Sequence, residues 1–251
     1  MSTAGLRRAA TYRARVAAPS TTTESAVRSD WLRSSIVRFA VVGASLLVLG
    51  LVLGLALVGR HGGGALQSWD NTVETWSISH RGGLVGVAKV IATWGDASLL
   101  GVIAVVLTGI WLVAARSLRG LIPILAYLGG EGLVFLIREI MHRHRPPTAN
   151  YPAPHAVPGV HETSYSFPSG HAVAVTALLF ALLGALALAR RAAWAWPVAL
   201  VASCFVADTR LVLGVHWFSD VAIGLLLGIA WGSTVAVVGL SLPSFAQLRR
   251  R

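Results

Sequence analysis

Three separate stretches of the chain carry arginine, histidine and carboxylate side chains at spacings that suit phosphoryl transfer. They are "REIMHRHRPP" (138–147), "PSGH" (168–171) and "DTRLVLGVHWFSD" (208–220). A guanidinium group stays ionised and can bind two phosphate oxygens at once, so arginines are the side chains expected around a phosphate dianion. The first and third stretches therefore predict an arginine clamp for phosphate, made of Arg138, Arg145 and Arg210.

The second stretch is predicted to add uncharged donors to the same anion. Pro168 and Ser169 stand where an apolar helix begins. The amides of Gly170 and His171, with the Ser169 hydroxyl, would then face an anion at the positive end of the helix dipole. Glycine at position 170 would let the backbone approach phosphate with no side chain between them.

The third stretch has the spacing of an oriented histidine nucleophile. His216 and Asp220 are four residues apart, so one helical turn would place them on the same face. A carboxylate on one imidazole nitrogen fixes the tautomer and leaves the other nitrogen free to attack. We predict that His216 is the nucleophile, Asp220 its partner, and His171 the general acid that protonates the leaving alcohol. This chemistry requires no metal and no cofactor.

Simpler structural interpretations exist for several of these side chains. Arg138 and Arg145 could be interfacial arginines that reach lipid headgroups. His142 and His144 have a spacing open to metal binding, although no cysteine or carboxylate cluster accompanies them. Glu131 lies within an apolar segment, where it could be either a structural partner or a functional group.

The elements that position these residues are predicted to be membrane helices. The chain has 251 residues, of which 55% are hydrophobic and only 12% charged. A soluble domain would carry about twice that charged fraction. The uncharged segment 39–58 is long enough to cross a hydrocarbon core of about 30 Å. The net charge of +11 comes from arginines at the ends of apolar segments, which indicates membrane topology rather than nucleic-acid binding.

The apolar segments predict an all-α fold, a polytopic bundle of six transmembrane helices. These span residues 36–58, 97–115, 120–138, 172–189, 193–212 and 219–240. Residues 61–95 carry tryptophans among scattered charges and predict interfacial helices, although 85–94 is apolar enough to dip into the bilayer. Residues 1–35 and 241–251 are predicted to be basic cytoplasmic tails, the first of them disordered, around one membrane domain of residues 36–240.

Arginine placement predicts that both termini lie in the cytoplasm. With the N-terminus inside, most of the 21 lysine and arginine residues fall on the inner side, as the positive-inside rule requires. The three stretches described above then share the opposite, extracytoplasmic side. Arginines on that side break the rule locally, and anion binding would explain them. The predicted location is the inner (plasma) membrane.

The three stretches also resemble, in combination, the signatures of the type 2 phosphatidic acid phosphatase family. They read R-x6-R-P (138–146), PSGH (168–171) and T-R-x5-H-x3-D (209–220), within a resemblance that covers about residues 60–240. That family includes vanadium haloperoxidases and bacterial polyprenyl-pyrophosphate phosphatases. The resemblance implies a six-helix core, an active site near the outer leaflet, a phosphohistidine at His216 and acid–base catalysis by His171. Arg138 replaces the usual lysine and Thr209 the usual serine.

We therefore expect an integral-membrane phosphatase that hydrolyses a lipid phosphate monoester or pyrophosphate without a metal. The expected substrates are polyprenyl pyrophosphate, phosphatidic acid or phosphatidylglycerol phosphate, and the expected partner is the bilayer, not nucleic acid. A phosphotransferase that uses the same phosphohistidine is one alternative, and a membrane transporter is another. The proline-rich loop 146–167 is either a connector or a lid, and the oligomeric state is not predicted.

Overall fold

The computed structural model describes residues 21–152 and 165–249, and over these ranges the chain is helical with no β-strand. Six helical segments are long and apolar enough to cross a membrane. They are Ile36–Val58, Ala97–Ala115, Leu118–Met141, Gly170–Arg190, Ala195–Val212 and Phe218–Leu240. This confirms the predicted all-α bundle with six spans. The third span is longer than predicted, because it begins at Leu118 and continues to Met141.

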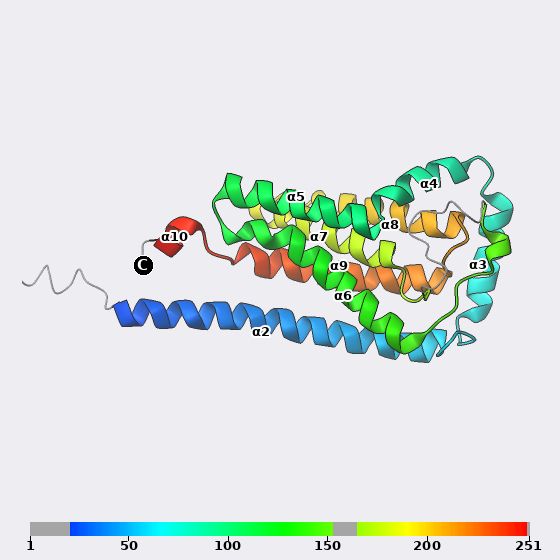
Figure 1. Ribbon diagram of the computed structural model, residues 1–251, viewed down its shortest axis with the longest axis horizontal. Helices are drawn as coiled ribbons and strands as arrows, with labels where there is room; N and C mark the ends of the chain where they lie inside the picture. Colours follow the sequence, from blue (N-terminus) through cyan, green and yellow to red (C-terminus); the bar gives the residue numbers. More distant parts are fainter. Residues whose placement is uncertain (1–20, 153–164, 250–251) are drawn as a thin grey trace, which may run out of the picture.

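The spans correspond to named helices in Figure 1. The first lies in α2 (Thr21–Leu53), which continues as a π-helical turn, η1 (Gly54–Val58). The others are α5 (Ala97–Ala115), the 3-10 turn η2 (Leu118–Leu121) with α6 (Ile122–Met141), α7 (Gly170–Arg190), α8 (Ala195–Val212) and α9 (Phe218–Leu240). The described residues also form the short helices α3 (Gln67–His80), α4 (Leu84–Trp94), η3 (Thr148–Asn150) and α10 (Phe245–Arg249).

Helix α7 is the centre of the bundle. It packs against α5, α6, α8 and α9, and it has the largest buried share of the six spans. Its contact with α9 is close because α9 presents glycines. A Cβ atom at Gly228 would lie 2.7 Å from the carbonyl oxygen of Val173, and one at Gly232 would lie 2.4 Å from that of Ala177. Small residues at such contacts let membrane helices pack backbone to backbone.

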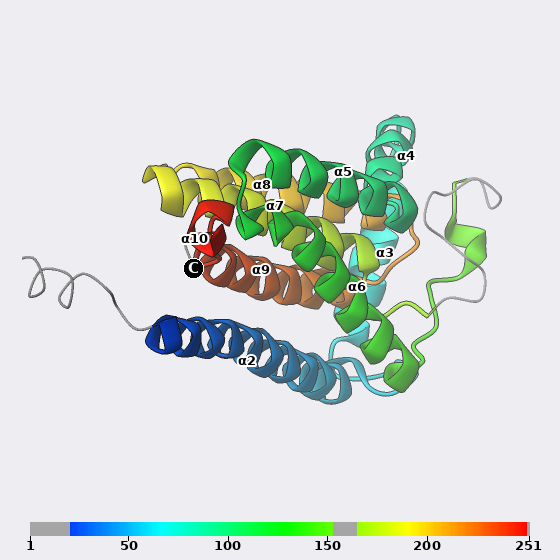
Figure 2. The same ribbon diagram turned by 60° about the vertical axis from the view of Figure 1, so that its left-hand side comes forward.

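Helix α2 lies along the outside of the bundle, where it packs against α6 and α9 (Figures 1 and 2). Most of its span is exposed, and the exposed side chains are apolar, among them Val41, Val48 and Val52. This arrangement suits a helix whose outer face meets lipid, since lipid tails are as apolar as these side chains.

Helices α3 and α4 lie at one end of the bundle, between the first two spans (Figure 1). This agrees with the predicted interfacial helices. Trp69, Trp76 and Trp94 on these helices are mostly exposed, as expected of aromatic side chains at a membrane interface. The bundle end that they cover is the end where α6 finishes and where α7 and α9 begin.

Helix α2 begins at Thr21, so residues 21–35 form one continuous helix with the first span. The division into two basic tails and one membrane domain stays a prediction. Apolar periodicity does not mark this extension, whose sequence is rich in serine and threonine. Residues 1–20 lie outside the described range. At the other end, α10 forms a short helix within the predicted tail 241–251.

Candidate active site

The end of α6 delivers the first group of predicted site residues. His142, immediately after the helix, has a φ of 47°, which ends the helix in a left-handed turn and directs the following arginines back toward the bundle. One turn before this end, Arg138 donates from Nε and Nη2 to the carbonyl oxygen of Pro168, at 3.2 and 3.1 Å. Arg138 is thereby held against the start of α7.

The start of α7 presents a buried hydroxyl without a partner. Ser169 is fully buried, its amide donates to the carbonyl oxygen of Asp220 at 3.1 Å, and its Oγ has no hydrogen-bond partner among the described residues. A buried hydroxyl left in this state is costly unless a ligand satisfies it. At Gly170, a Cβ atom would lie 3.4 Å from Nη2 of Arg138, so the glycine also makes room for this guanidinium.

His216 and Asp220 are in contact, but not in the way the spacing suggested. His216 precedes α9, Trp217 is the N-cap residue, and Asp220 is the third residue of the helix. Asp220 Oδ2 lies 3.3 Å from Nδ1 of His216 and accepts from the Trp217 amide at 3.0 Å. The pair therefore meets through the capping geometry of the helix start, not across one helical turn.

Arg145 occupies the other side of the His216 ring. Its Nη1 lies 3.0 Å from Nε2 of His216 and donates to the carbonyl oxygen of Val215 at 2.9 Å. A guanidinium can only donate and a carboxylate can only accept, so the two contacts of the ring assign its tautomer. The proton sits on Nδ1 facing Asp220, and the lone pair of Nε2 faces the arginine clamp.

His171 is held by the interfacial helix α4. Its Nε2 lies 2.8 Å from the carbonyl oxygen of Ala92 and 3.3 Å from Nη1 of the fully buried Arg210. The carbonyl of Ala92 can only accept and the guanidinium of Arg210 can only donate, so the shorter contact, to Ala92, favours a proton on Nε2 of His171. Nδ1 is the nitrogen left for a substrate. His171 from α7 and Arg210 from α8 are thus in contact at the bundle end that holds His216.

Burial and nearby positive charges disfavour the protonated form of His216. Burial lowers the pKa of the His216 imidazole well below its ordinary value, and the positive charges of Arg145, Arg210 and Arg138 lower it further. Burial also lowers the pKa of Arg145. Burial raises the pKa of the Tyr151 phenol, against the opposing charges of Arg145 and Arg210. A cluster of three guanidinium groups around an unprotonated imidazole is suited to bind an anion and attack it.

Two charged residues of this end were not predicted as part of the site. Arg143 and Asp70 are buried, and Arg143 bridges Asp70 of α3 to Asp220 of α9. The Ser166 hydroxyl donates to Oδ2 of Asp220, and the Ser219 hydroxyl accepts from Nη1 of Arg143. The sequence offered one signal for Arg143, which breaks the positive-inside pattern. It offered none for Asp70, which stands in an interfacial segment far from the three stretches.

His142 and His144, whose spacing was open to metal binding, make other contacts in the structure. The His142 ring stacks on His61 and lies 4.5 Å from the ring of Tyr165, while the backbone carbonyl of His144 accepts from Trp217. Over residues 21–152 and 165–249, no group of three or more His, Cys, Asp or Glu side chains is arranged to hold a metal ion. The loop that was either a connector or a lid falls largely in 153–164, outside the described residues.

Comparisons with known proteins identify the family of the chain. Residues 119–240 match the family model of the PAP2 superfamily. The chain is 31% identical over 163 residues to decaprenylphosphoryl-5-phosphoribose phosphatase from Mycobacterium tuberculosis, a match that covers 65% of this chain and 85% of that protein. It is 29% identical over 168 residues to phosphatidylglycerophosphatase B from Bacillus subtilis, covering 65% of this chain and 72% of that protein.

The fold has a solved counterpart as well. The crystal structure of a transmembrane PAP2 type phosphatidylglycerolphosphate phosphatase from Bacillus subtilis superposes with a TM-score of 0.62 at 25% sequence identity. The superposition covers 79% of this chain and 94% of that one, so it includes most of the helical bundle.

Proposed function

This chain belongs to the PAP2 superfamily of membrane phosphatases, and we propose that it removes a phosphoryl group from a lipid phosphate monoester or pyrophosphate through a phosphohistidine on His216. The observation that carries the proposal is the environment of the His216 ring. Nδ1 faces Asp220 at 3.3 Å, and Nε2 faces Nη1 of Arg145 at 3.0 Å. The unprotonated nitrogen therefore points to the place where the arginine clamp would hold a phosphate.

In this proposal the phosphoryl group binds between the arginine clamp and the start of α7. Arg138, Arg145 and Arg210 would neutralise the phosphate oxygens, and the unpartnered hydroxyl of Ser169 would donate to one of them. The amides of Gly170 and His171 lie at the first turn of α7, where the helix dipole favours a negative charge. These groups would also stabilise the charge that develops on the transferring phosphoryl group.

The first proposed step forms the covalent intermediate. The lone pair of His216 Nε2 attacks phosphorus, and the bond between phosphorus and the leaving-group oxygen breaks. The electron pair of that bond stays on the oxygen, which takes a proton from Nδ1 of a protonated His171. Asp220 stabilises the positive charge that His216 acquires, as the carboxylate does in a Ser-His-Asp triad.

The second proposed step returns the enzyme to its starting state. A water molecule attacks phosphorus, and its proton passes to Nδ1 of His171, which was left neutral by the first step. The bond from phosphorus to Nε2 breaks, and its electron pair restores the lone pair on His216. Inorganic phosphate then leaves the arginine clamp.

The proposed substrates are lipids whose tails stay in the bilayer while the phosphate reaches the pocket. Polyprenyl phosphates and pyrophosphates stand first, with phosphatidic acid and phosphatidylglycerol phosphate after them. The relatives support this range, since one is named for a decaprenyl-linked phosphoribose and another for phosphatidylglycerol phosphate. The six apolar spans support this proposal, because lipid tails can surround such a bundle.

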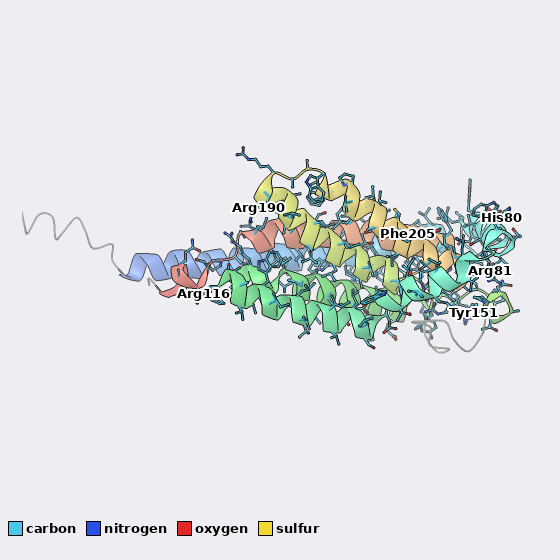
Figure 3. The ribbon with its side chains drawn as sticks, turned by 90° about the horizontal axis from the view of Figure 1, so that it is seen from above. His80, Arg81, Arg116, Tyr151, Arg190 and Phe205 are labelled. Atoms are coloured by element: carbon cyan, nitrogen blue, oxygen red, sulfur yellow. The ribbon has the colours of Figure 1, made fainter. Side chains whose placement is uncertain are left out.

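We further propose that both termini are cytoplasmic and that the pocket opens on the outer side of the inner (plasma) membrane. Figure 3 shows Arg116 and Arg190 at the end of the bundle near the start of α2, and Arg81 and Tyr151 at the opposite end. Arginines at the first end follow the positive-inside rule if that end is cytoplasmic. Reporter fusions to the C-terminus test the orientation, and an extracytoplasmic signal would contradict it.

The test of the proposed function is release of inorganic phosphate by the purified full chain from a panel of lipid phosphates. Wild type should release phosphate from at least one member, and His216→Ala should not. Transfer of the phosphoryl group to an added acceptor lipid instead of water would identify a phosphotransferase. A wild-type protein that binds these lipids without any turnover would refute the proposal.

A further inference from the structure

A buried line of charges connects the interfacial helix α3 to the His216–Asp220 pair. Arg143 lies at its centre, with its side chain 1% exposed, and the side chains of Asp70 and Asp220 on either side are fully buried. Such groups are rarely buried unless paired. None of the three is in the arginine clamp, and neither Asp70 nor Arg143 has a role in the proposed reaction steps.

The contacts along this line are short and use the two ends of the guanidinium separately. Nη2 of Arg143 donates to Asp70 Oδ2 at 2.6 Å, and Nη1 donates to Asp220 Oδ1 at 2.5 Å. Ser219 closes the arrangement, because its amide and hydroxyl donate to Asp70 Oδ1 and Oδ2, each at 2.8 Å. Arg143 therefore holds one oxygen of Asp220 while the other oxygen, Oδ2, faces His216.

The charges on this line have a consequence for His216. Arg143 by itself would neutralise Asp220 and weaken its support for a positive imidazole. Asp70 opposes this, because it shares the charge of Arg143 and leaves the three groups with one net negative charge beside the ring. That charge matters most when Nε2 bonds to phosphorus, since the ring then becomes positive.

We propose, on the basis of the phosphohistidine mechanism above, that Asp70 and Arg143 are positioning residues for the nucleophile. Arg143 fixes the rotation of the Asp220 carboxylate so that Oδ2 faces Nδ1 of His216, and Asp70 preserves the negative charge of that carboxylate. In this arrangement an interfacial helix, α3, takes part in catalysis without contacting the substrate.

A purely structural role would look different. If Asp70 only held α3 against the start of α9, its loss would lower the amount of folded protein. The enzyme that still folds would keep the wild-type kcat and the wild-type pH dependence of activity. A positioning role acts on His216, so it changes kcat and the pH profile of the folded enzyme while substrate binding by the arginine clamp persists.

The charged and titratable groups that face His216 come from every element around the pocket. They are Arg138 of α6, Arg145 of the segment after α6, His171 of α7, Arg210 of α8 and Asp220 of α9. In Asp70→Asn these groups all remain, and only the partner of Arg143 loses its charge. Arg143 and Asp220 then carry no net charge between them, and the loss of the net negative charge beside the ring disfavours protonation of His216.

The experiment compares purified wild type with Asp70→Asn, with kcat and KM for a lipid phosphate measured as a function of pH. The expected result is a fall of kcat by about 10–100-fold, the size of loss that follows removal of a group that orients a metal-ligating side chain, since Asp70 likewise acts through the carboxylate that orients His216. KM should stay within about twofold, a change of about 0.4 kcal/mol, because the hydrogen bonds of Asp70 are to Arg143 and Ser219 and not to the arginine clamp. The acid limb of kcat/KM should move to lower pH.

Glu74→Gln is the matched control, since it removes a carboxylate charge one turn along the same helix. Glu74 accepts from Asn150 Nδ2 at 2.7 Å, a contact that the glutamine oxygen can keep. Among the described residues, no hydrogen bond or ion pair joins Glu74 to Arg143 or Asp220. The control should keep the wild-type kcat and pH profile. A double-mutant cycle combines Asp70→Asn with Arg143→Gln. The fold-loss of kcat in the double variant should be smaller than the product of the fold-losses in the two single variants.

A folded Asp70→Asn with wild-type kcat and acid limb would overturn the inference, and so would equal changes in Glu74→Gln. If Asp70→Asn does not fold, Ser219→Ala replaces it. That variant removes one contact from each of Asp70 and Arg143 without changing a charge, so kcat should fall several-fold at unchanged KM. Wild-type kcat in Ser219→Ala would then overturn the inference. Absence of turnover in wild type would instead refute the proposed function.

Discussion

Nε2 of His171 lies 2.8 Å from the carbonyl oxygen of Ala92, a residue 79 positions earlier in the interfacial helix α4. This contact fixes which nitrogen of the proposed general acid faces the substrate. The end of α4 also touches the ring directly, because a Cβ atom at Gly95 would lie 2.6 Å from Cδ2 of His171. The position of the imidazole therefore depends on a glycine outside the three stretches that carry the chemistry.

The first prediction concerns this glycine. Gly95→Ala should push the His171 ring out of place and lower kcat for a lipid phosphate by about 10-fold or more, within the range attributed to general acid catalysis. Gly86→Ala is the control on the same helix, since an added methyl group there meets nothing within 4 Å. Phosphate release by the two purified variants checks this, and equal activities would show that α4 does not position the ring.

The second prediction separates the general acid from the nucleophile. His171→Ala should reduce turnover of alcohol-leaving lipid phosphates by about 10²–10⁴-fold. An activated aryl phosphate needs little protonation of its leaving group, so its turnover should fall much less. The ratio of the two losses is the measurement, and a ratio near one would count against proton donation by His171.

The third prediction concerns the covalent step. His216→Ala should abolish phosphate release from every substrate, because it removes the proposed attacking atom, Nε2 of the imidazole whose Nδ1 faces Asp220. Wild type quenched in alkali during turnover should carry a phosphoryl group on His216, detectable by peptide mass. Substantial turnover by a folded His216→Ala protein would remove His216 from the role of nucleophile.

The fourth prediction follows from the lowered pKa of His216. A group with a lowered pKa stays unprotonated as the pH falls through the ordinary histidine value of about 6.5, so Nε2 keeps its lone pair there. The acid limb of kcat/KM should therefore lie below that pH. Arg145→Gln removes a positive charge 3.0 Å from Nε2 and should move the limb to higher pH while raising KM. A wild-type limb at or above the ordinary value would contradict the prediction.

The fifth prediction is that turnover persists after treatment with EDTA. The proposed steps assign charge stabilisation to the arginine clamp and proton transfer to His171, so no step depends on a metal. Activity of the purified enzyme before and after chelation is the measurement. Inactivation that zinc or magnesium reverses would show that a metal takes part.

The spans and the three chemical stretches were predictable because each depends on a local pattern. Long uncharged segments identified the spans, and the spacing around Arg145, Ser169 and His216 indicated one anion site. The contact between His171 and Ala92 was not predictable, since a backbone carbonyl has no sequence signature. Asp70 was missed for a related reason: its partner, Arg143, lies 73 residues away, and only the folded bundle brings them together.

The close packing of α7 and α9 limits which positions of the sequence can change without loss of activity. His171 stands at the beginning of α7 and His216 just before α9, so the separation of these two imidazoles depends on how tightly the two helices pack along their length. A methyl group at Gly228 or Gly232, deep in the apolar region, would force the helices apart and spoil proton transfer at the distant end. Sequence change should therefore be tolerated on the lipid-exposed face of α2 and suppressed along this helix pair, well beyond the residues that touch substrate.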